Sequence, residues 1–192
     1  IPPLGGIITS WNWNMGGPGT YVAPTNSSSP EPIFVYDNDG FYNVNLEVTD
    51  TNGCTHDTTI IVEVYCNPTA NFNAPAVCES DITLFTDLSS QGASPSAAIA
   101  AWNWTMNGNG SYVNGTSSTS QNPQYVFDDC GTHNVNLEVT DINGCTHDTT
   151  IIVTVYCNPT ANFIYSPSLC EGDTTLFTDL SNPGTSPSAA II

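Results

Sequence analysis

The stretch from Tyr42 to Phe72 reads YNVNLEVTDTNGCTHDTTIIVEVYCNPTANF, and the stretch from His133 to Phe163 reads HNVNLEVTDINGCTHDTTIIVTVYCNPTANF. These two 31-residue segments differ at three positions and lie 91 residues apart in the chain. A repeat of this length is the size of a whole domain and far exceeds the repeating unit of a solenoid. The chain therefore contains a duplicated domain.

Each copy of this segment is predicted to fold into a β-hairpin. In the first copy, apolar residues at 44, 46 and 48 alternate with polar ones, which is the period of a strand with one buried face. The Asn52-Gly53 pair that follows favours a tight turn, because both residues accept a positive φ. A second strand, rich in β-branched residues, is predicted from Thr58 to Tyr65.

Outside the duplicated segment, short apolar stretches bounded by Pro, Gly and Ser predict further strands. They lie at residues 68–72, 82–87, 99–106 and 124–127. No stretch has the periodicity of an amphipathic helix. Many short strands at this spacing predict an all-β fold class, with tandem immunoglobulin-like antiparallel β-sandwiches.

Several motifs, taken in this order, resemble the PKD domain family. They are a W-x-W strand, a glycine-rich turn, an N-P-x-Y-x-F segment, an alternating V-x-L-x-V-x-D strand and a closing N-G turn. In the second copy they stand at Trp102-Asn103-Trp104, Gly108-Asn109-Gly110, Asn122 to Phe127, Val135 to Asp141 and Asn143-Gly144. The resemblance covers essentially the whole chain. It implies PKD-like sandwiches, which are spacers and adhesion or interaction modules of bacterial and archaeal surface proteins and also accompany secreted hydrolases.

The resemblance has one departure, at the F-G-D-G turn that is usual in the family. The corresponding residues are Met15-Gly16-Gly17-Pro18-Gly19 in the first copy and Met106-Asn107-Gly108-Asn109-Gly110 in the second. The Asp is absent from both copies, so a site built on this turn is not expected here.

The PKD-like register divides the chain into one complete domain and two partial ones. Residues 67–157 are predicted to form the complete domain, residues 1–66 the C-terminal part of a domain, and residues 158–192 the N-terminal strands of a further one. Two explanations stay open. Either a longer tandem array has been cut, or residues 1–66 of a neighbouring chain complete residues 158–192 by strand complementation, which would propagate into a head-to-tail fibre.

The charge composition limits the partners of the chain. Lys and Arg are absent, against 18 Asp plus Glu, which gives a formal net charge of −18. Because no Lys or Arg can neutralise phosphates, we expect binding neither to nucleic acid nor to an anionic membrane. No apolar run approaches the length of a transmembrane helix, so membrane insertion is not expected either. Seven cysteines point to an oxidising compartment, so the protein is expected to be secreted and to lie outside the cell or on its surface. The start at Ile1, without Met or a basic leader, predicts a mature or internal segment.

The cysteines are all disulfide candidates. Cys78, Cys130 and Cys157 should lie towards one pole of the sandwich and Cys145 at the other. We expect bridges to cluster at domain junctions, with Cys66–Cys145 as one cross-domain pair, and each bridge would contribute about 2–4 kcal/mol. The full set is Cys54, Cys66, Cys78, Cys130, Cys145, Cys157 and Cys170.

No metal or other cofactor is expected. The triplets Cys54-Thr55-His56 and Cys145-Thr146-His147 place Cys and His on one face of a strand and could begin a zinc site, but a disulfide-bonded Cys beside an exposed His is the preferred interpretation. The pairs Asp37/Asp39 and Asp128/Asp129 are candidate Ca²⁺ ligands, with a solvated acidic edge preferred. His133, which replaces Tyr42 in the second copy, is interpreted as a packing variant.

Sugars are the remaining candidate partners. In each W-x-W strand one Trp should face outward, so Trp11 or Trp102 could stack on a carbohydrate. The preferred interpretation is that neighbouring strands or a neighbouring chain cover both Trp side chains of the strand. Four N-x-S/T sequons are candidate glycosylation sites. They begin at Asn26, Asn103, Asn109 and Asn114.

The chain has none of the common catalytic motifs, such as G-x-S-x-G, H-E-x-x-H or a P-loop, so it is not expected to be an enzyme. The sequence predicts a structural or adhesive extracellular repeat protein that forms a fibre, stalk or surface spacer. Its partners would be copies of itself or adjacent repeats of the same chain. The alternative is a carbohydrate-binding accessory module of a larger secreted enzyme, with surface polysaccharide as its ligand.

Overall fold

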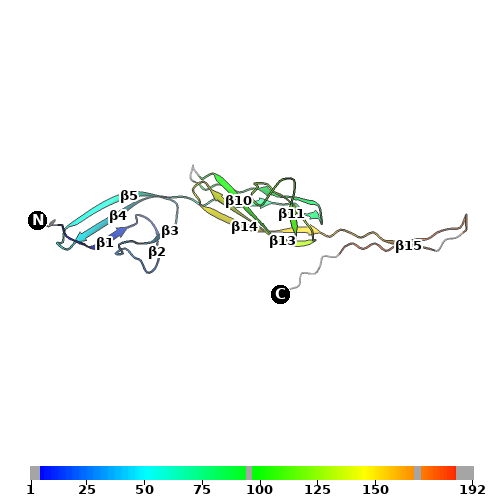
Figure 1. Cartoon of the computed structure of the whole chain (residues 1–192), viewed down its shortest axis with the longest axis horizontal. Helices are drawn as coiled ribbons and strands as arrows, with labels where there is room; N and C mark the ends of the chain where they lie inside the picture. The colour runs from blue at the N-terminus through cyan, green and yellow to red at the C-terminus, as the bar shows by residue number, and fades with distance from the viewer. Residues whose placement is uncertain (1–4, 94–96, 167–169, 185–192) are drawn as a thin grey trace. The chain divides into compact units, whose positions relative to one another are not determined.

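The computed structural model describes residues 5–93, 97–166 and 170–184, and these ranges contain strands and loops but no helix (Figure 1). They form two compact units. The first, called the open unit, comprises the chain up to Asn67 with Gly92–Ala97, and the second comprises Pro68–Gln91 and the chain from Ala98 onward. We call the part of the second unit that ends at Cys157 the closed unit. No helix that could cross a membrane occurs in the described ranges.

Two sheets and a separate pair of strands make up the closed unit. The larger sheet has the order β10-β13-β14-β7, the smaller has the order β11-β12-β8, and β6 pairs with β9. All pairs are antiparallel except β14 with β7. The strands are β6 (Phe72–Asn73), β7 (Val77–Cys78), β8 (Ile82–Leu84), β9 (Thr86–Asp87), β10 (Ile99–Met106), β11 (Gly110–Tyr112), β12 (Gln124–Phe127), β13 (Gly131–Asp141) and β14 (Thr146–Tyr156).

The core of the closed unit follows from the alternation in β13. Val135, Leu137 and Val139 are fully buried, whereas the residues between them are only half-buried. They pack with Trp104 of β10, whose side chain is 2% exposed. Each buried side chain of this size contributes about 1.5–3 kcal/mol to folding. The turn after β13 is closed by Asp141, whose carboxylate accepts hydrogen bonds from the backbone N–H groups of Asn143 and Cys145 at 2.9 and 2.8 Å.

The open unit repeats the later strands of the closed unit in the same register. Its sheet has the order β1-β4-β5, with β2 paired to β3 alongside. Trp13 lies opposite Leu46, as Trp104 lies opposite Leu137. The strands are β1 (Ile8–Asn14), β2 (Gly19–Tyr21), β3 (Phe34–Tyr36), β4 (Gly40–Asp50) and β5 (Thr55–Val64). No residue between 5 and 67 is buried, because the open unit contains no counterpart of β6, β7, β8 or β9 in its described residues.

Strands that correspond to β6 and β9 occur at the other end of the chain, in residues 158–184, which we call the tail. Here β15 (Phe163–Tyr165) pairs with β16 (Phe177–Asp179), and Thr160 forms a bridge with Asn182. The pair corresponds in sequence to β6 and β9 of the closed unit. Every residue of both tail strands is exposed.

The predicted all-β class and most predicted strands are confirmed, with two local differences. The strand expected over residues 68–72 is reduced to a bridge at Thr69 and the short β6. The strand expected over residues 82–87 is interrupted at Phe85, whose side chain is buried and whose backbone N–H donates to Pro123 O at 3.0 Å. Residues 1–4 and 185–192 of the predicted partial domains lie outside the described residues.

Candidate interaction surface

In the closed unit, the first strands of the domain lie on a surface formed by its later strands. β8 pairs along β12, with Thr83 opposite Tyr125, and β7 pairs with the end of β14, with Cys78 opposite Tyr156. Ser80 N donates to Phe127 O at 3.1 Å. These backbone bonds fix the register in which residues 67–91 cover the sheet edges.

Three aromatic rings hold the two layers together. The rings of Phe72 and Phe85 lie with their centroids 5.0 and 5.3 Å from that of Trp104, and 6.0 Å from each other. All three side chains are at most 3% exposed. Such aromatic contacts contribute about 0.5–1.5 kcal/mol each beyond the burial itself.

Polar contacts surround this aromatic cluster. Trp102 Nε1 donates to Asp87 Oδ2 at 2.8 Å, and Gln121 Nε2 donates to the same oxygen at 3.1 Å. Burial raises the pKa of Asp87, but the hydrogen bonds from Ser89, Gln121 and Trp102 outweigh it, so the pKa is below its usual value. In addition, Ala70 N donates to His147 Nδ1 at 3.1 Å.

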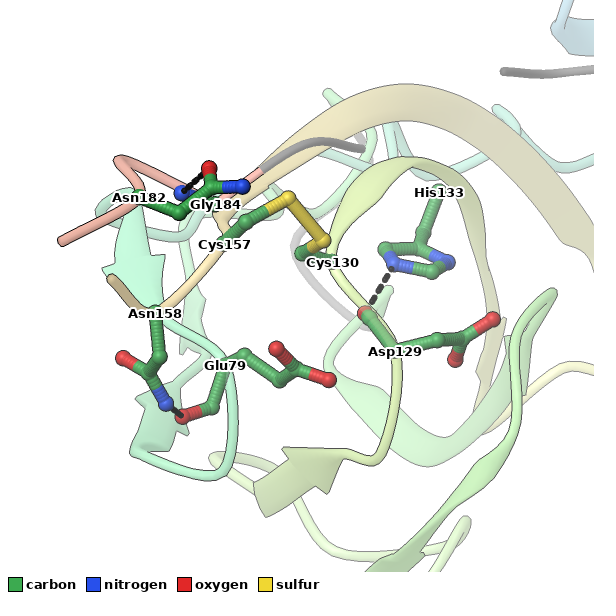
Figure 2. Close-up of a disulfide and its surroundings, with 8 residues drawn as sticks. All are labelled: Glu79, Asp129, Cys130, His133, Cys157, Asn158, Asn182 and Gly184. Atoms are coloured by element: carbon green, nitrogen blue, oxygen red, sulfur yellow. Dashed lines mark hydrogen bonds between the residues drawn. A yellow bond between two sulfur atoms is a disulfide. The ribbon is translucent and has the colours of Figure 1, made fainter. Parts of the chain in front are cut away.

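The end of the closed unit is tied by a disulfide, which Figure 2 shows with its surroundings. Cys130 and Cys157 form this bridge, with their Cα atoms 4.8 Å apart. Beside it, Asn158 Nδ2 donates to Glu79 O at 2.9 Å, and Glu79 N donates to Tyr156 O at 2.7 Å. The chain around Cys78 and Glu79 therefore runs alongside the end of β14.

In the open unit the equivalent surface of the later strands is uncovered within the described residues. A hollow of about 370 Å³ is lined by Tyr36, Asp39 and Val64 among others. In the closed unit, the counterpart of Tyr36, Phe127, accepts a hydrogen bond from Ser80 N, and the counterpart of Val64, Val155, pairs with Val77 of β7. A second hollow of about 360 Å³ lies beside Trp13, Met15 and Phe34.

The exposure of individual residues marks the same uncovered surface. Ile60 is 64% exposed, whereas its counterpart Ile151 packs against the core of the closed unit. Trp13 is half-buried, although its Nε1 donates to Ser29 O at 3.0 Å just as Trp104 Nε1 donates to Ser120 O at 2.9 Å. This surface of the open unit, which is called the receiving surface below, therefore has its folded geometry without the strands that cover its counterpart in the closed unit.

The tail exposes the side chains that would cover such a surface. Phe163 and Phe177, the counterparts of Phe72 and Phe85, are 60% and 65% exposed. Asp179, the counterpart of Asp87, accepts a hydrogen bond from Ser181 Oγ at 2.6 Å, and the hydrogen bonds from Ser181 lower its pKa. The other large apolar residues exposed in the tail are Ile164, Tyr165, Leu176 and Leu180.

Among the predicted disulfide candidates, the structure joins Cys130 to Cys157. As expected, Cys78 lies towards the same end of the closed unit, since it pairs with the residue before Cys157. The cross-domain pair Cys66–Cys145 joins residues of two different units and stays a prediction, as does the clustering of bridges at junctions. Cys54 and Cys170 are exposed thiols.

In the closed unit, the His of the Cys-Thr-His triplet contacts a distant part of the chain, because the His147 ring accepts a hydrogen bond from the backbone N–H of Ala70. Within the described ranges, no three His, Cys, Asp or Glu side chains gather as metal ligands do. Asp37 and Asp39 line the first hollow of the open unit, while Asp128 is exposed and Asp129 half-buried.

His133 is a packing residue, as expected. Its ring is 6% exposed and stacks on Phe127, with centroids 4.3 Å apart. Its two ring nitrogens lie 3.2 Å from Asn107 O and 3.1 Å from Asp129 O.

The sugar-related candidates stay predictions. Trp11 and Trp102 are half-buried, and Trp102 packs partly against the core in addition to its bond with Asp87. The sequon asparagines Asn26, Asn103, Asn109 and Asn114 are all exposed. Their exposure makes them accessible to modification, and no sugar contact follows from it.

Sequence reasoning missed two contacts of this surface, the Trp102–Asp87 bond and the Ala70–His147 bond. One signal was available for them, because Trp, Asp and His recur at the corresponding positions of the repeat, as Trp11, Asp179 and His56. Recurrence of these polar and aromatic residues is what a shared docking contact would require.

Comparison with known proteins gives two family matches. Residues 65–155 match one family model described as a PKD domain, and residues 3–62 match a second model with the same description. The predicted boundaries at 66/67 and 157/158 stay predictions. No curated protein sequence matches the chain significantly.

Two solved structures illustrate the structural neighbours. The fibronectin(III)-like modules of Clostridium thermocellum CbhA share 14% identity at a TM-score of 0.38, over 79% of this chain and 80% of that one. The protocadherin GammaB4 extracellular domain shares 10% identity at a TM-score of 0.30, over 90% of this chain and 32% of that one.

Proposed function

The chain belongs to the PKD domain family, and from this premise we propose that it is a structural or adhesive protein whose copies join head to tail outside the cell into a fibre, stalk or surface spacer. The family matches within the chain are to non-catalytic modules of an extracellular type. In the joint that we propose, the tail of one copy completes the open unit of the next copy.

The observation that carries this proposal is that corresponding residues of the repeat occur in two opposite environments. Phe72 and Phe85 are 3% and 2% exposed in the closed unit, whereas Phe163 and Phe177 are 60% and 65% exposed in the tail. The difference arises because only the first pair has a W-x-W strand against which to pack. The open unit carries an equivalent strand whose Trp13 is only half-buried.

The register of the joint follows from the closed unit by the repeat offset. Thr83 opposite Tyr125 becomes Thr175 opposite Phe34, and Leu84 opposite Gln124 becomes Leu176 opposite Ile33. The second substitution places two apolar residues together, of which Ile33 is 58% and Leu176 is 69% exposed in the separate chain. Their burial is worth about 25 cal/mol per Å² of apolar surface removed from water.

Polar contacts transfer to the joint as well. Asp179 would accept the Nε1 hydrogen of Trp11, and His56 would accept the backbone hydrogen of Ala161, by analogy with the 2.8 and 3.1 Å contacts of the closed unit. Addition of strands to an open edge satisfies backbone groups and buries apolar side chains together. A contact between two different surfaces of the same chain does not close on itself, so it propagates.

The tail meets the receiving surface as a partly ordered hairpin, since β15 and β16 are already paired. Preorganisation lowers the conformational entropy lost on association. With no Lys or Arg in the chain, the joint depends on apolar packing and hydrogen bonds and forms without lysine or arginine salt bridges.

The test compares three forms of the chain by light scattering after size exclusion and by negative-stain electron microscopy. The 192-residue chain is expected to form concentration-dependent oligomers and regular filaments. A chain ending at Cys157 and the variant Phe177→Ser should stay monomeric. Ile152→Ser, which changes a 65% exposed residue on β14 of the closed unit, should assemble normally.

Two results would overturn the proposal. One is a 192-residue chain that stays monomeric at high concentration with residues 158–184 accessible to protease. The other is assembly that persists without the tail, which would place the contact elsewhere on the molecule.

A further inference from the structure

We propose that each head-to-tail joint is sealed by an intermolecular disulfide between Cys66 of the receiving copy and Cys170 of the copy that donates its tail. This inference rests on the proposed strand complementation and adds a covalent bond to it.

In the closed unit, the end of β14 has a cysteine-bearing neighbour on each side. On one side, Gly131 is opposite Val155, so the preceding Cys130 stands opposite Tyr156. On the other side, Cys78 is opposite the same Tyr156. Cys157, the next residue of that strand, already bridges diagonally to Cys130 over a Cα–Cα distance of 4.8 Å. A disulfide between the position of Cys157 and the position of Cys78 on β7 would likewise join a residue to the neighbour of the residue opposite it.

The spacing on the β7 side fits a disulfide. Neighbouring strands lie about 4.8 Å apart, and disulfides span Cα–Cα distances of roughly 4.4–6.8 Å. Beyond the last paired residues of β7 and β14, these two segments of the chain stay together, because Glu79 N donates to Tyr156 O at 2.7 Å and Asn158 Nδ2 donates to Glu79 O at 2.9 Å.

Of the closed-unit cysteines Cys78, Cys130 and Cys157, the open unit has a counterpart of Cys157 and lacks one of Cys130. Cys66 corresponds to Cys157, but the position of Cys130 is occupied by Asp39. The bridge seen in the closed unit therefore has no counterpart within the open unit. Cys66 is a half-buried thiol at the edge of the hollow that Tyr36, Asp39 and Val64 line.

The tail supplies the third cysteine of the set in a matching local fold. Cys170 corresponds to Cys78, and Asp173 N donates to Cys170 O at 3.0 Å, just as Asp81 N donates to Cys78 O at 3.0 Å. The turn between them has a residue with positive φ in both places, Gly172 and Ser80. On docking in the closed-unit register, Cys170 would stand opposite Tyr65, next to Cys66.

The chemistry is a thiol–disulfide exchange with an external disulfide as oxidant. The Cys66 thiolate attacks one sulfur of oxidised glutathione and releases one glutathione thiolate. The Cys170 thiolate then attacks the mixed disulfide, forms the Cys66–Cys170 bond and releases the second glutathione thiolate. Two protein thiols are thereby oxidised and one external disulfide is reduced. The Cys66–Cys145 pair is an exclusive alternative, because one sulfur forms one disulfide.

The experiment is non-reducing gel electrophoresis of the 192-residue chain after assembly with oxidised glutathione, with peptide mass spectrometry of the bands. A ladder of multiples of 20.4 kDa is expected, and reductant should collapse it to one band. Cys66→Ser and Cys170→Ser should each abolish the ladder while filaments still form. Cys78→Ser, which removes the corresponding cysteine of the closed unit, should keep it.

The outcomes separate this inference from the function on which it rests. Filaments without a ladder, a ladder that survives in Cys66→Ser, or a Cys66–Cys145 peptide in the wild-type chain would each overturn the disulfide and leave complementation standing. Absence of both filaments and soluble oligomers would overturn the proposed function itself.

Discussion

The rings of Phe163 and Phe177 lie 6.0 Å apart at an interplanar angle of 53°, which reproduces the arrangement of Phe72 and Phe85 at 6.0 Å and 54°. The first pair is exposed and the second is buried against Trp104. The two rings of the tail hairpin therefore have the same mutual arrangement as the buried pair of the closed unit.

Replacing Phe177 with Ala should weaken the joint without unfolding the chain. Removal of a buried Phe side chain costs about 3–5 kcal/mol, so the dissociation constant should rise roughly 100-fold or more. Calorimetric titration of a peptide of residues 158–192 into a chain ending at Cys157 measures this. A change below threefold would show that this ring is not buried on association.

The matched substitution Phe85→Ala should act on folding instead. Phe85 is 2% exposed and packs on Trp104, so the closed unit should lose about 3–5 kcal/mol of its free energy of unfolding. Urea unfolding of the chain ending at Cys157, followed by tryptophan fluorescence, reports it. Equal stability of this variant and the parent would mean that the ring contributes little to the core.

Asp87→Asn should remove part of the acid sensitivity of the closed unit. The native pKa of Asp87 lies below its ordinary value of 3.8, so its ionised form stabilises the fold above that value. This contribution is lost as the pH falls from 3.8 through the lower native pKa. Unfolding free energies at a series of pH values from about 6 down to 2 should therefore fall less steeply in the variant than in the parent.

Cys130→Ser should destabilise the closed unit and leave the open unit unchanged. The bridge closes a loop over a sequence separation of 27 residues. A loop of this length corresponds to about 3–4 kcal/mol by the chain-entropy relation. Hydrogen exchange, resolved by peptide, distinguishes the two units, and faster exchange confined to the closed unit, at residues 68–91 and 98–157, is the expected result. Acceleration in residues 5–67 as well would contradict it.

Association should strengthen when salt is added. The formal net charge is −18 with no Lys or Arg, so two approaching copies repel each other and the joint has no lysine or arginine salt bridge to screen. Light scattering across about 0.01 to 0.5 M NaCl tests this, since the Debye length falls over that range. Dissociation at high salt would reveal an attractive electrostatic contact instead.

Much of the fold could be predicted from the repeat and from strand alternation. Residues 44–48 and their copy predict β4 and β13 because burial on one face leaves a direct mark on the sequence. The Cys130–Cys157 pairing left no such mark, since it depends on how β13 and β14 come together at one end. The Trp102–Asp87 contact likewise depends on the packing of two strands far apart in the chain.

The expected strand over residues 68–72 shows the limit of local patterns. Its residues are compatible with a strand, but Asn71 Oδ1 accepts from the neighbouring Phe72 N, and Ala70 N bonds to the His147 side chain. Side-chain acceptors thus take the place of a neighbouring strand's carbonyls. The strands that form the receiving surface of the open unit could be predicted from the 91-residue repeat. The hollows beside Val64 and Trp13 could not, because they depend on how side chains pack in three dimensions.

In an assembly joined by the proposed head-to-tail contact, the two ends would differ, because the tail hairpin and the receiving surface are different surfaces of the chain. One terminus of such an assembly would always present a vacant receiving surface, and the other a hairpin with nothing to cover. The two termini would then respond to different blocking molecules. A peptide of residues 158–192 would stop growth at the first terminus only, and a chain ending at Cys157 would stop it at the second, so length and direction of growth could be controlled separately.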